Sequence, residues 1–415
     1  MYPNVDIVDQ IKAVRKKKGI TQAELAIRSG LKPAALARIE NHRMSPTVKM
    51  LSRILDALGM KLSLSEYEPI GKDLVLCLDM HGCPNRCKHC WLGELPNGQI
   101  RDDYADFLVG LFRPYFRNLT FYSWLREPDF CPNYKWRWEE DKRLSSKSPT
   151  RFELASFYRI VKDPGYVKWL KKVGTKKVQL TFFGLEKTTD EFVGRAGAYG
   201  ELLQATKILL ENQIEPRWQI FLYQSNKEEA VALLDVAKSM GVNEIIVHEG
   251  SCDGNNRNLY DIRINKSEIP EALKPYYLNY PNNLSERECV EMLRDDHSFY
   301  LPHNENEIVL YVTADLNVYY NFTNPSPAWK IGNVRDDDID FVVRRAVAED
   351  IPALTLAKTI SIGELARRYG DMHSDKVFDL EDYKMYLLNN YLDEKYNCGK
   401  ELDALCALIA KEEAI

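Results

Sequence analysis

Three features of membrane and exported proteins are missing from this sequence. No window approaches the roughly 18 uninterrupted apolar residues that a transmembrane helix needs. Residues 1–11 include Asp6 and Asp9 and contain no apolar stretch like that of a secretory leader. The nine cysteines are odd in number and scattered except for one group, which argues against a disulfide framework. We therefore expect a cytoplasmic protein with no membrane segment.

Charge is distributed unevenly along a chain of otherwise ordinary composition. Its 415 residues are 45% hydrophobic and 28% charged, which is typical of a soluble globular protein, and the length predicts two or three domains. The net charge of −5 conceals twelve Lys and Arg against five Asp and Glu in residues 1–64, so this part carries +7 and the remainder −12. A basic N-terminal part on an acidic body predicts that the N-terminal part alone meets an anionic partner.

Short helical patterns fill residues 6–64. Thr21 with Glu24 three positions later forms a capping-box pattern, and Pro33 suits the first turn of a later helix. The stretches TQAELAIRSGL, LARIEN and SPTVKMLSRILDALG closely resemble the XRE/Cro-repressor family of helix-turn-helix proteins. The resemblance implies that helix 33–41 enters the major groove of DNA. The DNA-contact candidates are Gln22, Lys32, Arg38 and Arg43.

Two departures from that family leave a second interpretation open. The start of the implied recognition helix, Pro33-Ala34-Ala35, offers no hydrogen-bonding side chain to base edges. His42 stands where the family usually has glycine. Residues 1–66 are therefore either a DNA-binding domain or a helical module that docks a peptide, a partner protein or the rest of its own chain.

Three of the nine cysteines lie within eight positions of one another, in the stretch HGCPNRCKHCW at residues 81–91. They follow a short apolar run, residues 73–80, whose length fits a strand. Active sites of parallel α/β proteins gather at the carboxyl ends of their strands. The metal-ligand candidates are Cys83, Cys87 and Cys90.

Two metals suit this group of cysteines. Three thiolates leave a tetrahedral zinc site one ligand short, so zinc would require His81 or His89 as the fourth. Three thiolates can instead hold three irons of a [4Fe–4S] cluster and leave the fourth iron open to an external ligand. The residues alone allow both.

The pattern Cys-x3-Cys-x2-Cys after a first strand strongly resembles the radical S-adenosylmethionine (SAM) superfamily. The resemblance implies a [4Fe–4S] cluster on the three cysteines and SAM on the open iron. It also implies an electron donor such as flavodoxin or ferredoxin. His89 occupies a position that the family often uses near the adenine of SAM.

Strand patterns alternate with helical patterns over the central part of the chain, which predicts parallel pairing and right-handed crossovers. The expected strands lie at residues 73–80, 118–125, 151–161, 177–184, 217–226 and 243–250. We expect an α/β fold, a partial (β/α)6 TIM-like barrel, preceded by an all-α helix-turn-helix domain and followed by a small α+β extension. The predicted domains are residues 1–66, 70–255 and 256–415.

The resemblance extends to residues near the expected strand ends. Leu125-Arg126-Glu127-Pro128 stands where the family has Gly-Gly-Glu-Pro, which contacts the amino group of SAM, so both glycines are missing here. The SAM-contact candidates are Glu127, Thr181, Arg195, Gln219 and His89. The candidates for substrate contact or catalysis, at the mouth of the sixth strand, are His248, Glu249 and Cys252. For each of these residues, ordinary local hydrogen bonding is the alternative.

A β-hairpin is predicted in residues 308–340, with its turn at residues 314–317. The stretch VTADLNVYYN resembles the twitch or SPASM extensions of radical SAM enzymes. Their auxiliary-cluster cysteine is replaced here by Asn321, or by Tyr320 with a one-residue slip, so we expect no auxiliary cluster. Residues 354–410 are expected to be mostly helical.

Three functions are compatible with these features. The first is a radical SAM enzyme that cleaves SAM to a 5′-deoxyadenosyl radical, which abstracts hydrogen from a peptide or small-molecule substrate. The second is a DNA-binding transcriptional regulator whose cluster domain senses iron, redox state or SAM. The third is an interaction protein stabilised by zinc.

Overall fold

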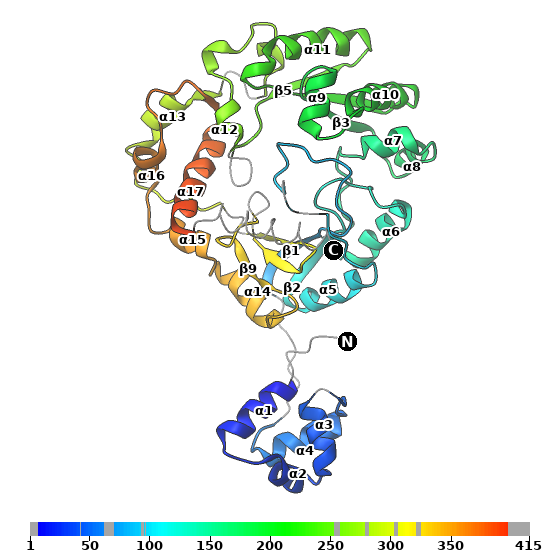
Figure 1. Ribbon diagram of the computed structural model, residues 1–415, viewed down its shortest axis with the longest axis vertical. Helices are drawn as coiled ribbons and strands as arrows, with labels where there is room; N and C mark the ends of the chain where they lie inside the picture. The colour runs from blue at the N-terminus through cyan, green and yellow to red at the C-terminus, as the bar shows by residue number, and fades with distance from the viewer. Residues whose placement is uncertain are drawn as a thin grey trace. The chain divides into compact units, whose positions relative to one another are not determined.

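The chain separates into two compact units, residues 1–69 with 333–342 and residues 70–332 with 343–415. The predicted three-domain division, with a boundary near residue 255, stays a prediction. Among the described residues, no helix combines the length and the hydropathy that crossing a membrane would take. The computed structural model (Figure 1) describes residues 7–41, 43–61, 70–92, 95, 97–252, 258–278, 282–302, 306–320 and 325–396.

The N-terminal unit contains four helices, α1 (Ile7–Lys17), α2 (Gln22–Ser29), α3 (Pro33–Glu40) and α4 (Val48–Ala57). The hydroxyl of Thr21 accepts a hydrogen bond from the backbone N–H of Glu24 at 3.2 Å, as its capping pattern predicts. Helix α2 ends at Gly30, whose φ of 62° places it in the left-handed region that favours glycine. A small apolar core joins the four helices; it comprises Val8, Ile11, Leu25, Ala26, Leu36, Ile39, Ile54, Leu55 and Leu58.

A five-stranded sheet in the second unit carries the segment before the cysteines. Its order is β2-β1-β7-β8-β9, with β1 parallel to both neighbours and β8 antiparallel to β7. The strands are β1 (Ile70–Leu78), β2 (Phe116–Tyr122), β7 (Glu307–Val312), β8 (Asn317–Tyr319) and β9 (Lys330–Asn333). The predicted hairpin is thus confirmed as β7 and β8, but its first strand also pairs with β1.

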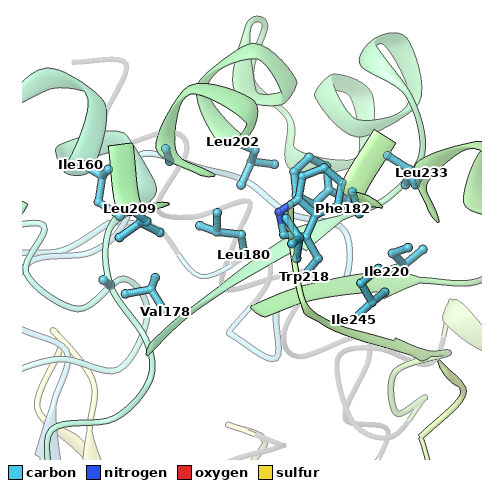
Figure 2. Packing of buried hydrophobic residues seen from close by; sticks show 14 of the residues in the cluster. Ile160, Val178, Leu180, Phe182, Leu202, Leu209, Trp218, Ile220, Leu233 and Ile245 are labelled. Carbon is cyan, nitrogen blue, oxygen red and sulfur yellow. The ribbon is translucent and has the colours of Figure 1, made fainter. Parts of the chain in front are cut away.

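A second sheet contains the expected fourth, fifth and sixth strands. They are β3 (Lys177–Phe182), β4 (Glu215–Phe221) and β5 (Glu244–His248), all parallel and in that order. Helices α9 (Glu186–Val193) and α10 (Ala198–Glu211) lie between β3 and β4 in the chain, and α11 (Lys227–Ser239) lies between β4 and β5. The outer face of this sheet is apolar, and Figure 2 shows Val178, Leu180, Phe182 and Trp218 packed among Leu202, Leu209 and Leu233 of the helices.

The prediction of a strand over residues 151–161 is wrong. This segment has no strand and ends in helix α7 (Phe157–Lys162), after which α8 (Tyr166–Lys172) follows. Side chains from the end of α6 (Tyr134–Leu144) satisfy the edge of β2 instead. The backbone N–H of Leu119 donates to Ser146 Oγ at 3.1 Å, and that of Phe121 to Ser145 Oγ at 2.9 Å.

Helices form the outer ring of the second unit in Figure 1. The C-terminal segment is mostly helical as predicted, and residues 397–415 lie outside the described residues. The elements are α5 (Tyr104–Phe112), α12 (Leu259–Ile262), β6 (Leu284–Ser285), α13 (Glu286–Leu293), α14 (Ile339–Ala348), α15 (Pro352–Ala357), α16 (Ile362–Tyr369), β10 (Val377–Phe378) and α17 (Leu380–Tyr396).

Candidate functional site

The cysteine loop, residues 81–91, begins three residues after β1 ends and rests on the end of α9. The backbone N–H groups of Arg86 and Lys88 donate to the carbonyls of Val193 and Phe192, both at 2.9 Å. Gly194 ends α9 with a φ of 71°, and a Cβ there would come within 3.0 Å of the Arg86 carbonyl oxygen. The close approach of loop and helix therefore needs glycine at this position.

Asn97 hydrogen-bonds to both the backbone N–H and the backbone carbonyl of the first cysteine. The N–H of Cys83 donates to Asn97 Oδ1 at 3.1 Å, and Asn97 Nδ2 donates to the Cys83 carbonyl at 2.7 Å. Arg126 also donates to Asn97 Oδ1, at 3.1 Å, while it forms a buried ion pair with Asp79 at 3.1 Å. Asn97 belongs to no sequence motif, and the only sequence signal for Arg126 is that an arginine replaces a family glycine.

All three cysteines of the loop are half-buried free thiols. Burial raises the pKa of the Cys87 thiol to about 12, and the neighbouring Cys90 and Glu127 raise it further. Burial likewise raises the pKa of Cys83, together with Glu127 and the other two thiols. Cys83 and Cys87, whose ionisation burial opposes, suit a cationic iron cluster, which stabilises thiolates.

The described side chains include no group of three or more His, Cys, Asp or Glu that could hold a metal ion. A [4Fe–4S] cluster does not need such a group, because each thiolate binds a different iron and the sulfurs do not meet at one point. The three thiols therefore fit the cluster by number, by proximity and by their shared loop.

Glu127 lies next to this loop. Its Oε2 is 3.8 Å from Cys83 Sγ, and its Oε1 is buried and accepts no hydrogen bond of good geometry from any described residue. Burial raises the pKa of Glu127 to about 7, although Ser156 and Arg195 lower it. A carboxylate with a buried oxygen available beside the cysteines could accept a hydrogen bond from a cationic ligand.

Arg195 also reaches the cysteine loop. Its Nε donates to Asn85 Oδ1 at 2.8 Å, and its Nη2 lies 2.8 Å from Glu201 Oε2. The guanidinium sits over the ring of Phe157, 5.4 Å from its centroid. The structure thus brings two predicted site residues, Arg195 and Glu127, to the loop that carries the cysteines.

Thr181 and Gln219 contact each other. They are register partners on β3 and β4, and Thr181 Oγ1 donates to Gln219 Oε1 at 2.9 Å. Gln179 Nε2 donates to the same oxygen at 2.8 Å, and Arg217 donates to Gln179 at 2.9 Å. The predicted pair therefore belongs to a polar row on the face of the sheet opposite the apolar helices.

His89 is half-buried in an aromatic cluster beside the cysteine loop. Its ring centroid lies 4.8 Å from that of Phe183 and 5.6 Å from that of Phe221. Burial lowers the pKa of His89 to about 4, and His248 contributes to the decrease. Burial also lowers the pKa of His248 to about 4, and its Nδ1 accepts a hydrogen bond from Gly250 at 3.0 Å. Both rings are therefore neutral at physiological pH.

A cavity of about 760 Å³ lies beside this cluster. It includes both residues that flank Cys90, and its walls are largely apolar and aromatic, which is typical of small-molecule sites. The residues that line it are Val75, Cys77, His89, Trp91, Thr120, Tyr122, Trp124, Leu125, Lys147, Ser148, Thr150, Phe152, Phe221, His248, Gly250, Ser251, Leu259, Glu307 and Val309.

The three candidates at the carboxyl end of β5 occupy different surroundings. His248 lines the large cavity, whereas Glu249 and Cys252 do not. The side chain of Glu249 is 9% exposed, accepts a hydrogen bond from the hydroxyl of Tyr277 at 2.6 Å and lies 3.8 Å from Arg263. Cys252 is fully buried, and its charge would interact with that of Arg263.

The DNA-contact candidates divide into two groups. Lys32, Arg38 and Arg43 are exposed, and Lys32 is the N-cap residue of α3. Gln22 instead donates from Nε2 to Glu40 Oε2 at 2.7 Å, where Glu40 is fully buried and pairs with Arg15 at 2.6 Å. Gln22 therefore supports a buried ion pair, while the other three are accessible. His42 lies outside the described residues.

Comparisons with known sequences concern the N-terminal part. A model of the helix-turn-helix family, HTH_3, matches residues 11–64. The immunity repressor protein of Bacillus phage phi105 is 39% identical over 54 residues, which is 13% of this chain and 38% of the repressor. Antitoxin HipB of Escherichia coli K12 is 30% identical over 66 residues, which is 16% of this chain and 75% of HipB. The chain thus spans little more than a third of the repressor.

Comparisons of structure concern most of the chain. Native anSMEcpe with bound AdoMet and Cp18Cys peptide is 13% identical, with 81% of this chain and 99% of that chain covered and a TM-score of 0.42. Streptococcus suis SuiB bound to precursor peptide SuiA is 10% identical, with 80% and 84% covered and a TM-score of 0.41. Both TM-scores are too low for a functional assignment.

Proposed function

We propose that this chain, which belongs to the helix-turn-helix family through residues 11–64, is a radical SAM enzyme with a DNA-binding-type head. The observation that carries the proposal is the cysteine loop. Three free thiols in the order Cys83-x3-Cys87-x2-Cys90 follow directly after a parallel strand and adjoin a cavity of about 760 Å³. The parallel strands β1 and β2 of one sheet and β3, β4 and β5 of the other are five of the six predicted strands, and with helices outside them they support a partial barrel around that cavity.

The cofactors would be a [4Fe–4S] cluster and SAM. When bound, they supply one-electron cleavage of SAM and a 5′-deoxyadenosyl radical able to abstract hydrogen. Glu127 is the best placed of the candidate SAM contacts, because its carboxylate lies next to Cys83 and its buried Oε1 accepts no hydrogen bond of good geometry from a described residue. Its carboxylate would bind and orient an ammonium group, and Arg195 would position the loop through Asn85.

The other candidate SAM contacts have different roles in this proposal. His89 is a neutral ring beside the cavity and would pack against the adenine. Thr181 and Gln219 hydrogen-bond to each other, so one of them would have to turn toward SAM in order to contact it.

The cavity walls would bind and shield the reacting carbon. Trp91, Tyr122, Trp124 and Phe152 line the cavity, and their rings packed against a bound substrate would exclude water and protect a radical from side reactions. His248 lines the cavity and is the first candidate for substrate contact, while Glu249 and Cys252 would act from behind it. The substrate is a peptide or a small molecule, and the electron donor would be a flavodoxin or ferredoxin in the cytoplasm.

Anaerobic reconstitution tests the proposal. The purified chain should be brown with about four irons, and should convert SAM to 5′-deoxyadenosine and methionine when dithionite is added. Cys87→Ala should abolish both the colour and the product. Cys289→Ala, which removes a buried thiol of α13, is the matched control and should preserve both. A colourless protein with one zinc, or intact SAM, would contradict the enzyme.

The helix-turn-helix head supports a second function, a DNA-binding regulator with a domain that senses iron–sulfur chemistry or SAM. Three exposed cations, Lys32, Arg38 and Arg43, lie on or next to α3. Binding to a DNA fragment from upstream of the gene should then weaken steeply with salt. A regulator of this kind should bind DNA differently when the cluster is present and when it is absent, and should leave SAM uncleaved.

A further inference from the structure

A smaller pocket of about 160 Å³ lies at the carboxyl end of β5, next to the large cavity. The two share His248, Gly250 and Ser251 as lining residues. The other residues that line the smaller pocket are Glu249, Leu278, Asn283, Asp379 and Asp382. One ligand could therefore extend from the aromatic cavity into a compartment of different chemistry.

The smaller pocket contains more negative than positive groups. Three carboxylates line it, from Glu249, Asp379 and Asp382. Among the described residues, Arg263 is fully buried and contacts two of these carboxylates, at 3.1 Å from Asp382 and 3.8 Å from Glu249. One guanidinium against three carboxylates leaves the pocket attractive to a cation.

Asn283 supplies an independent observation. Its side chain is 3% exposed and lines the pocket, and its buried Oδ1 accepts no hydrogen bond from the described part of the chain. A buried acceptor left without a donor costs about 1–3 kcal/mol. A ligand that brings N–H donors into the pocket would remove that cost.

We propose that this pocket binds a cationic nitrogen of the substrate, a primary ammonium or a guanidinium, while the carbon part of the substrate occupies the aromatic cavity. The assignment of the ligand as substrate rests on the proposed radical SAM function. The acceptors come from different elements, and no described group of three or more His, Cys, Asp or Glu could hold a metal ion. The three N–H donors of an ammonium can reach such separated acceptors.

Binding of a probe amine tests the proposal on the full-length chain purified without its cluster. The probe is 4-phenylbutylamine, and its neutral counterpart is 4-phenylbutan-1-ol. Calorimetry should show the amine binding about tenfold tighter than the alcohol, the ratio expected for one charge-assisted hydrogen bond. Because neither iron nor SAM is present, failure to cleave SAM in the separate assay would leave this result unchanged.

Two variants and a control locate the binding. Asp379→Asn removes a carboxylate but preserves the hydrogen bond that Asp379 Oδ1 accepts from the N–H of Glu381. Asn283→Leu removes the buried acceptor. Each should weaken amine binding about tenfold and leave alcohol binding unchanged. Glu381→Gln removes a neighbouring exposed charge outside the pocket and should change neither.

Three results would overturn the proposal. The amine and the alcohol could bind equally well, or both pocket variants could bind the amine like the natural chain. The third contradicting result is that the amine does not bind but Mg²⁺ alone does, and that Asp379→Asn abolishes the binding of Mg²⁺. The pocket would then be a metal site. Thermal melting of each variant shows whether it is folded before its binding is compared.

Discussion

Arg195 donates a hydrogen bond from Nε to Asn85 Oδ1 at 2.8 Å, across 110 positions of the chain. The contact ties the segment before α10 to the middle of the cysteine loop. Arg195→Met preserves the bulk of the side chain but removes this donor, so the free energy of unfolding should fall by about 1–3 kcal/mol. Chemical denaturation of the full chain measures the change. In a double-mutant cycle with Asn85→Ala, strictly additive effects would show that the two side chains are not coupled.

Iron loading should depend on a residue that binds no iron. Asn97 hydrogen-bonds to both the N–H and the carbonyl of Cys83, so Asn97→Ala should leave all three thiols present but less well placed. We expect less iron per chain after reconstitution, measured by metal analysis. Asn118→Ala, which removes a hydrogen bond to Asp73 away from the loop, should load normally. Equal iron in both variants would contradict a positioning role for Asn97.

The outer face of the second sheet depends on Trp218. Its ring stacks on Phe182 with centroids 3.9 Å apart, and its Nε1 donates to Thr206 Oγ1 at 3.0 Å. Trp218→Ala should lower the free energy of unfolding by about 3–5 kcal/mol, since it leaves a large cavity in a closely packed core. Trp218→Phe should cost less. Denaturant titration of both variants tests the order, and equal losses would contradict it.

The ionisation of Asp141 should make the stability of the chain depend on pH. Burial raises the pKa of this carboxyl to about 7, against hydrogen bonds from Ser123. The unfolded state loses the proton near pH 4 and the folded state near pH 7, so this group reduces stability as the pH rises between those values. Asp141→Asn can still accept from Ser123 and does not ionise. The free energy of unfolding of this variant, measured relative to that of the natural chain, should therefore rise by about 2–3 kcal/mol between pH 5 and pH 8.

A variant of α6 provides the control for that measurement. Glu139 lies on the same helix with its side chain 63% exposed, and Glu139→Gln removes an equal charge. Its stability difference from the natural chain should be nearly the same at pH 5 and pH 8. If Asp141→Asn behaved in the same way, Asp141 would not be the titrating group.

Two variants in the N-terminal helix-turn-helix part distinguish a residue that would contact DNA from a residue that stabilises the fold. Lys32→Gln should lower the slope of log K against log salt by about 1, because Lys32 is exposed and would neutralise one phosphate. Gln22→Ala should leave that slope unchanged and reduce thermal stability, since the Gln22 amide donates to the buried Glu40. Binding titrations at several salt concentrations, with melting curves, distinguish the two effects. A Gln22 variant with a reduced slope would indicate that Gln22 contacts DNA.

The helices and strands that short-range sequence patterns determine are predictable from the sequence. The capped helices of the head and the strands β3, β4 and β5 follow from short-range patterns. The error at residues 151–161 arose because the edge of β2 is satisfied by the side chains of Ser145 and Ser146 rather than by another strand. One local signal was overlooked there: Ser156 caps α7 by accepting from the N–H of Arg159 at 3.2 Å.

The candidate site was only partly predictable for a similar reason. The three cysteines and Glu127 stand in recognisable motifs, whereas Asn97 acts through backbone groups fourteen positions away and appears in no motif. The small acidic pocket joins the end of β5 to Asn283 and the start of α17. No periodicity in the sequence connects such distant residues, so only the fold brings them together.

The parallel pairing of β1 with β7 sets the order of events during synthesis. Residues 73–78 of β1 pair with residues 307–312, so the strand before the cysteines is without one neighbour until the ribosome has passed residue 312. A nascent chain that ends near residue 255 would present an open strand edge, which invites association with other chains. The strand that leads into the cysteine loop therefore acquires its second neighbour late in translation, and a chain stopped before residue 307 lacks this support.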